Sequence, residues 1–140
     1  MHRHPLGRAR RLAVLASIVI IVGCLLPWYS LGGGEGLPLR EWRVFDGFGT
    51  LTFLAALLTV ALVALPYATA GRPVAIDAWP AYLGFLALAM LGEVLWAIQY
   101  VSVEATGFLP DRAPGFWLAI IGTLILARAV FEMHQEPAAA

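Results

Sequence analysis

Charge is scarce in this sequence, and lysine is missing altogether. Only 13% of the 140 residues are charged, and all nine basic residues are arginines. Soluble domains carry about 25% charged residues, whereas 61% of this chain is hydrophobic. A water-facing surface cannot accommodate that excess, so we expect lipid to solvate most of the chain. The formal net charge is zero and the only basic run is N-terminal, which argues against nucleic acid as a partner.

Cysteine and histidine are also too scarce for most cofactor chemistry. The single cysteine, Cys24, excludes an intrachain disulfide and a CxxC motif. His2, His4 and His134 are the only histidines and all lie near a terminus, so a buried haem or metal site is unsupported. The chain also lacks a P-loop, GxSxG, HExxH and paired intramembrane carboxylates. We therefore expect a protein that is not an enzyme and has no cofactor.

The apolar residues lie in four long runs. About 17 to 25 apolar residues are needed to cross the hydrocarbon core of a bilayer, and each run reaches that length. The predicted helices cover about 12–28, 47–65, 80–103 and 115–133. The sequence thus predicts an all-α membrane protein: an up-down bundle of four transmembrane helices forming one domain, 12–133. An Arg-rich segment, 1–11, precedes the bundle and a polar tail, 134–140, follows it.

Helix-end signals support these boundaries. Pro27 and Pro66 are expected to end the first and second helices, because proline cannot continue a helix without loss of a hydrogen bond. Asp46 and Asp77 are suitable N-caps for the second and third helices. Pro114 is tolerated in the first turn of the fourth.

Arginine placement predicts the orientation of the bundle. Four arginines precede the first helix, Arg72 lies in the middle link, and Arg128 is near the end of the fourth helix. Arg40, Arg43 and Arg112 lie on the opposite side. The side that holds the termini thus has six arginines and the opposite side has three. By the positive-inside rule, both termini are expected to lie in the cytoplasm. Exclusive use of arginine with abundant Ala, Gly and Leu is typical of a GC-rich bacterial genome, so we expect a multi-pass protein of the bacterial inner (plasma) membrane.

The loop after the first helix has two interpretations. Leu39, Trp42 and Phe45 recur at i, i+3 and i+6, which favours a short helix lying on the membrane surface; a short strand is the alternative. Arg40, Trp42 and Arg43 form a candidate binding surface beyond the outer leaflet. The alternative for these residues is simple anchoring at the interface.

Glu93 is a single carboxyl close to the middle of the predicted helix 80–103. An ionisable group at that depth is a functional hypothesis by default. The candidate intramembrane polar site contains Glu93, Thr59, Gln99 and Tyr100, and could bind a proton or cation or line a substrate pathway. The alternative is a protonated Glu93 that hydrogen-bonds another helix, with Thr59 as the expected partner.

Arg128 is not expected to be the counter-ion of Glu93. It lies roughly 10 Å away in depth, at 1.5 Å per residue. Glu132, one turn further along, is a nearer i, i+4 partner, and the long side chain of Arg128 can extend to the interface.

Cys24 ends the sequence Ile21-Val22-Gly23-Cys24, which resembles a bacterial lipoprotein signal. That resemblance implies cleavage before Cys24 and acylation of its thiol. The residues that follow stay apolar, however, where mature lipoproteins turn polar. The alternative is a small residue inside the first helix.

The fourth predicted helix has the clearest packing signal. Gly115, Ala119, Thr123 and Ala127 recur every four residues, with Gly122 beside them. Small residues at this spacing allow helix backbones to approach closely within a membrane. The stripe could pack inside one chain or between two copies, and the need to assemble four helices favours the first.

The sequence also resembles a known set of proteins. Leu26-Pro27-Trp28 ends the first apolar run, and Gly115-Phe116-Trp117-Leu118-Ala119-Ile120-Ile121-Gly122 opens the fourth. These motifs are similar to the "LPW" and "GxWLAxIG" motifs of uncharacterised bacterial four-helix integral membrane proteins. The resemblance implies the four-helix architecture and no activity. Small multidrug-resistance transporters differ, because their essential glutamate lies in the first helix, which is uncharged here.

Together these observations favour a non-enzymatic integral membrane protein. We expect an accessory, scaffold or interaction subunit whose partners are the bilayer and either a second copy or another membrane protein. The alternative is a small transporter or channel component that uses Glu93, and a lipid-modifying or quinone enzyme comes third.

Overall fold

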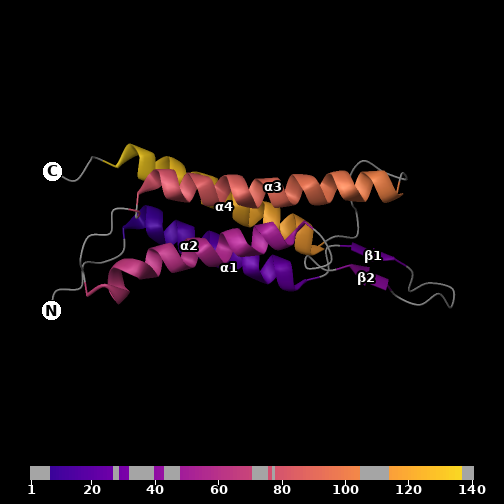
Figure 1. Cartoon of the computed structure of the whole chain (residues 1–140), viewed down its shortest axis with the longest axis horizontal. Coiled ribbons are helices and arrows are strands. Elements are labelled where there is room, and N and C mark those ends of the chain that lie inside the picture. Colours follow the sequence, from indigo (N-terminus) through magenta and orange to yellow (C-terminus); the bar gives the residue numbers. More distant parts are fainter. Residues whose placement is uncertain are drawn as a thin grey trace.

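The computed structural model describes residues 7–26, 29–31, 40–42, 48–70, 76, 78–104 and 114–136. Its elements, in order, are α1 (Arg8–Leu25), β1 (Tyr29–Leu31), β2 (Arg40–Trp42), α2 (Thr50–Ala68), α3 (Trp79–Glu104) and α4 (Pro114–Gln135). Four helices therefore account for nearly all of the described chain, and the two strands form a small appendage beside one end of them (Figure 1). The prediction of a helical fold is confirmed.

Three of the helices are long and apolar enough to cross a membrane. They are α2, the 79–99 part of α3, and α4. At 1.5 Å per residue, the 19 residues of α2 extend about 28 Å, close to the ~30 Å hydrocarbon core of a bilayer. Helix α1 is not among these three, since its first turn contains Arg8, Arg10 and Arg11. From Leu12 onward it has no charged residue.

The helix ends differ from the sequence prediction by up to four residues: α1 ends at Leu25 and α2 begins at Thr50, each three residues from the predicted position, and two further differences have a clear cause. Helix α1 begins at Arg8, four residues before Leu12, because arginines are good helix formers and an exposed first turn suits their charge. Helix α2 continues through Pro66 to Ala68 instead of stopping before the proline. Pro66 lies in the last turn, so one main-chain hydrogen bond is lost where the helix is already ending.

The predicted caps fall partly outside the described residues. Gly49 occupies the N-cap of α2, so the prediction for Asp46 is wrong; Asp46 itself, like Asp77 and Pro27, lies outside the described residues. Pro114 is the first residue of α4, as its sequence position indicates.

Residues 29–31 and 40–42 form a strand pair, where the sequence predicted either a short surface helix or a short strand. Strands β1 and β2 are antiparallel, with Tyr29 opposite Trp42 and Leu31 opposite Arg40. The helical prediction at Arg40 to Trp42 is therefore wrong. A segment this short gains little from helix formation, whereas pairing with the chain leaving α1 satisfies its backbone groups.

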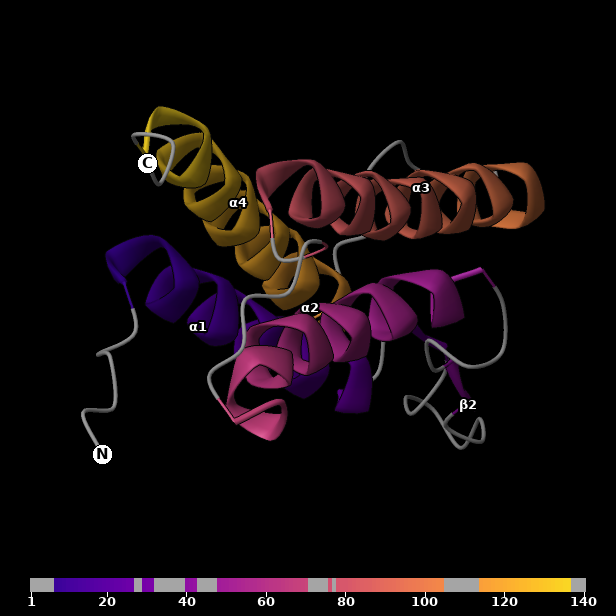
Figure 2. The same ribbon diagram turned by 60° about the vertical axis from the view of Figure 1, so that its left-hand side comes forward.

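Helices that contact each other run in opposite directions (Figure 1; Figure 2). Helix α1 packs most extensively against α4, and α2 packs against both α1 and α3. Arg8 at the start of α1 pairs with Glu132 near the end of α4. At the other end of this pair, Gly23 of α1 closely approaches Gly115 and Ala119 of α4. The pair is thus antiparallel along its whole length.

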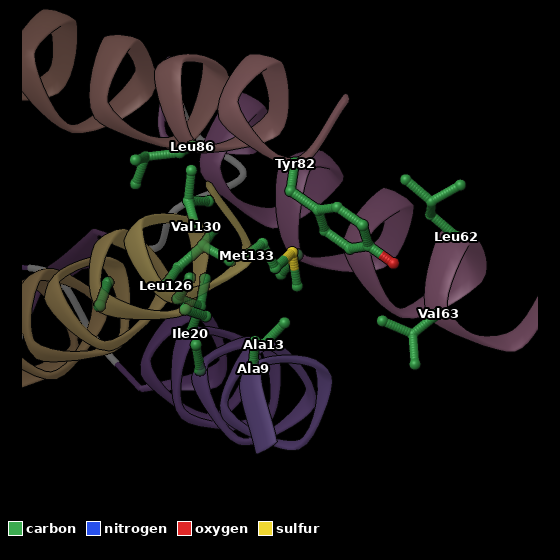
Figure 3. Packing of buried hydrophobic residues seen from close by; sticks show 14 of the residues in the cluster. Ala9, Ala13, Ile20, Leu62, Val63, Tyr82, Leu86, Leu126, Val130 and Met133 are labelled. Carbon is green, nitrogen blue, oxygen red and sulfur yellow. The ribbon is translucent and has the colours of Figure 1, made fainter. Parts of the chain in front are cut away.

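The α1–α4 interface contains mainly small side chains. Ala16, Ile20 and Gly23 of α1 lie against Gly115, Ala119 and Gly122 of α4, and the buried residues of α1 as a whole are Ala9, Ala13, Ala16, Ser17, Ile20, Gly23 and Cys24. Larger side chains fill the space toward the other helices: Leu86 of α3 lies near Val130 and Leu126 of α4, and the Tyr82 ring extends from α3 toward α2 (Figure 3). Large apolar residues such as Leu15, Ile18, Leu124 and Phe131 are instead exposed.

Candidate functional site

Glu93 is buried inside the helices, with only 7% of its surface exposed. It lies near the middle of α3, on the face directed toward α4, and its Oε1 is 2.6 Å from Oγ1 of Thr123. This contact joins two helices that otherwise share a less extensive interface than α1 and α4 do. Glu93 and Thr123 therefore form a polar link between α3 and α4.

The hydrogen-bond geometry of Thr123 bears on the protonation of Glu93. Oγ1 of Thr123 is also 2.9 Å from the carbonyl oxygen of Ala119. A hydroxyl has one proton to donate, and a carbonyl oxygen can only accept. Both contacts are hydrogen bonds at once when Thr123 donates to Ala119 and a protonated Glu93 donates to Thr123. A neutral carboxyl is also far less costly to bury than a carboxylate.

Thr59 is not the partner of Glu93, contrary to the sequence expectation. Its hydroxyl donates to the carbonyl oxygen of Ala55, in its own helix, at 2.8 Å. Thr59 and Thr123 are both buried and near mid-helix, so depth alone did not distinguish them. Gln99 is half-buried on α3, and the side chain of Tyr100 lies outside the described residues. Thr123 therefore takes the place that the sequence predicted for Thr59 beside Glu93.

A second polar link between helices was missed by sequence reasoning. The hydroxyl of Thr52 on α2 donates to the main-chain carbonyl of Ala89 on α3 at 2.9 Å. Gly92 lies beside it, and a Cβ on Gly92 would stand 2.5 Å from Oγ1 of Thr52 and 2.8 Å from its main-chain nitrogen. The available signal was Gly92 itself, since a glycine within a membrane helix often marks a close backbone approach.

The small-residue stripe of α4 faces α1 within the same chain. Gly115, Ala119, Gly122 and Thr123 are buried, while Ala127 is half-buried. A Cβ on Gly122 would lie 2.9 Å from the main-chain nitrogen of Ile20. The contact between α1 and α4 is therefore a backbone-to-backbone approach that only small residues permit.

The structure also places Arg128 and Cys24. Arg128 pairs with Glu132, Nε to Oε1 3.2 Å, as the i, i+4 spacing indicated. Cys24 is fully buried in α1. Among the described residues, no group of three His, Cys, Asp or Glu side chains could hold a metal ion.

For the candidate binding surface at Arg40, Trp42 and Arg43, the structure describes only the backbone of Arg40 and Trp42. Arg40 and Trp42 are the first and last residues of β2, and Arg43 lies outside the described residues. The strand pairing brings this segment next to the residues that leave α1. A role in binding stays a prediction.

No protein family, curated protein or solved structure matches this chain. The GxWLAxIG motif nevertheless has a physical explanation in the structure. Gly115, Ala119 and Gly122 face α1, whereas Trp117 is exposed on the outer side of α4. The motif therefore encodes a helix with one small-residue face and one large apolar face.

Substitutions at the two ends of the Glu93–Thr123 hydrogen bond are expected to lower stability by different amounts. Thr123→Val keeps the shape of the side chain but leaves the buried Glu93 carboxyl without its hydrogen-bond partner, at a cost of about 1–3 kcal/mol. Glu93→Gln retains an N–H donor for Thr123 and should cost less than Thr123→Val. Unfolding in mixed micelles by SDS titration, followed by circular dichroism, measures both.

Thr123→Ser is the matched control, since it keeps the hydroxyl and should recover most of the stability lost in Thr123→Val. If Thr123→Val proved as stable as the wild type, the hydrogen bond would have no structural role.

Proposed function

We propose that this chain is an integral protein of a bacterial inner membrane, with an up-down bundle of four transmembrane helices and both termini in the cytoplasm. The outward surface supports this proposal. Each helix exposes large apolar side chains, while small ones fill the α1–α4 interface. In water this distribution would be unfavourable, because burial of large apolar groups drives folding. In lipid, close approach of small residues is the main association device.

The proposal includes α1 as the fourth spanning helix. Leu15, Ile18, Val22 and Leu25 make its outward face apolar and exposed. The arginines lie in its first turn only, where long basic side chains can reach the interface from a membrane helix. A cytoplasmic position for that end follows from the arginine distribution.

We further propose that the protein acts without catalysis, as an accessory or interaction subunit. The observation behind this proposal is that the buried polar groups form their hydrogen bonds within the protein. Within the described part of the chain, the buried polar side chains Ser17, Thr52, Thr59, Glu93 and Thr123 all have hydrogen-bond partners in the protein. An interior of this kind holds helices together, and the outward faces are left to contact lipid, a second copy or another membrane protein.

The competing function is a small transporter or channel component, and Glu93 is the observation that favours it. An ionisable group at mid-membrane depth is the usual mark of an ion or proton pathway. Its protonation would have to change during transport, and the hydrogen bond to Thr123 would break in each cycle.

One experiment separates the two functions. The full chain is affinity-purified from native membranes after mild crosslinking, and the same material is reconstituted in proteoliposomes for pH-dependent flux measurements. We expect a second copy or another membrane protein to co-purify in fixed ratio, and no flux from wild type or Glu93→Gln. A strictly monomeric protein whose proton flux disappears in Glu93→Gln would establish the transporter.

A further inference from the structure

Positive charge gathers at the end of the bundle where α1 begins and α4 ends. Nε of Arg8 lies 3.6 Å from Oε2 of Glu132, and Nε of Arg128 lies 3.2 Å from Oε1 of the same carboxylate. One carboxylate thus holds two guanidinium groups near each other across the α1–α4 interface. Arg11, one turn after Arg8, is exposed and makes no ion pair with the described residues. Three guanidinium groups against one carboxylate leave a net positive charge.

These arginines retain the capacity to bind an anion. Both contacts with Glu132 use Nε, so the terminal amino groups of Arg8 and Arg128 are not taken by that carboxylate. Their side chains are 82% and 61% exposed. A guanidinium group presents five donors in a planar fork that matches phosphate oxygens. The arrangement therefore suits a phosphate group at the membrane surface.

An apolar surface continues from these arginines toward the middle of the helices. Leu15 follows Arg8 by seven residues and Arg11 by four, so all three share one face of α1. On α4, Ile121 and Leu124 precede Arg128 by seven and four residues. Leu15, Ile121 and Leu124 are all exposed. Because Glu132 joins Arg8 to Arg128, the two apolar faces lie on the same side of the α1–α4 pair.

We propose that this surface, formed by Arg8, Arg11 and Arg128 with Leu15 and Ile121 below them, binds an anionic glycerophospholipid. The phosphate lies against the guanidinium groups, and an acyl chain lies along the two apolar faces. The proposal rests on the proposed function, since it requires α1 to lie in the bilayer. A lipid is the ligand, and not a soluble phosphate ester, because only a lipid would use the exposed leucine and isoleucine side chains together with the charges.

The test uses the purified full chain in phosphatidylcholine nanodiscs and measures bound lipid by native mass spectrometry during titration with phosphatidylglycerol of the same acyl length. We expect the wild type to retain phosphatidylglycerol in preference to phosphatidylcholine. Each arginine near a membrane surface contributes about 1 kcal/mol, so Arg11→Gln should weaken retention about fivefold. Arg8→Gln combined with Arg11→Gln and Arg128→Gln should weaken it on the order of 100-fold.

Arg10→Gln is the matched control. Arg10 lies in the same turn of α1, but NH1 of its guanidinium is 3.5 Å from Glu136 and the side chain is less exposed than that of Arg8. Arg10→Gln should retain the lipid as the wild type does. Soluble glycerol 3-phosphate should compete only weakly, since it has no acyl chain.

Three results would overturn the lipid site. They are equal retention of the two lipids, equal weakening by Arg10→Gln and Arg11→Gln, and competition by glycerol 3-phosphate at phosphatidylglycerol concentrations. Each of them leaves membrane insertion untouched. Release of the chain from membranes at alkaline pH would instead contradict the proposed function, so the two failures are distinguishable.

Discussion

Gly122→Ala is expected to destabilise the bundle by about 1–3 kcal/mol, the usual cost of an extra methyl group in a tightly packed interior. The added Cβ would stand 2.6 Å from Cγ1 of Ile20, 2.9 Å from the Ile20 main-chain nitrogen and 3.0 Å from the carbonyl oxygen of Ala16. The Ile20 side chain can rotate, but the two main-chain atoms belong to α1 and move only with that helix. The substitution therefore has to separate α1 from α4, the most extensive helix pair.

Gly84→Ala is the matched control for Gly122→Ala. Gly84 lies within α3, and a Cβ there has no neighbouring atom within 4 Å. Alanine is favoured over glycine inside a helix by about 1 kcal/mol, so Gly84→Ala should leave the free energy of unfolding unchanged or raise it. SDS titration in mixed micelles, followed by circular dichroism, measures both variants. Equal effects at the two glycines would contradict the close α1–α4 contact.

Leu124→Arg is expected to reduce membrane insertion and folding by about 2.5–3.5 kcal/mol, the cost of an arginine at the centre of a membrane helix. Leu124 is 65% exposed and lies at the middle of α4, which covers Pro114–Gln135. In a water-soluble protein an exposed leucine at such a position could become arginine with an effect within about 0.5 kcal/mol. The substitution thus distinguishes a surface that faces lipid from one that faces water.

The control for Leu124→Arg is Gln135→Arg, which adds the same charge at the last residue of α4. There the side chain reaches water, and a cation near a helix C-terminus is slightly favourable. Glycosylation-based insertion assays and the yield of folded protein measure both variants. Normal insertion and folding of Leu124→Arg would show that the outward face of α4 does not meet hydrocarbon.

The helices could be predicted because the apolar runs that encode them are visible in the sequence itself. A long apolar run predicts a helix regardless of its neighbours, and four such runs correspond to α1, α2, α3 and α4. Details that depend on a neighbouring segment were less accessible. Pro66 was expected to end α2, yet a proline in a last turn costs little. The strand from Arg40 to Trp42 depends on pairing with Tyr29 to Leu31, which no helical periodicity reveals.

The candidate site shows the same limit. Burial and depth identified Glu93, and both follow from its position along the apolar run. The choice between Thr59 and Thr123 depends on how α2 and α4 are rotated about their axes, and single-sequence periodicity is too weak to give that rotation. The stripe of α4 was recognisable from its spacing, but its complement on α1, including Gly23 and Ala16, became evident only from the contact itself.

We expect the large apolar side chains on the outside of the helices to face lipid. A nitroxide spin label at Leu124→Cys, in a chain with Cys24→Ala and reconstituted in bilayers, tests it directly through collision rates with oxygen and with a water-soluble nickel chelate. Cys24 is fully buried, so its replacement leaves the labelled surface unchanged. We predict frequent collisions with oxygen, which concentrates in the hydrocarbon, and almost none with the chelate. Frequent collisions with the nickel chelate at this position would contradict it.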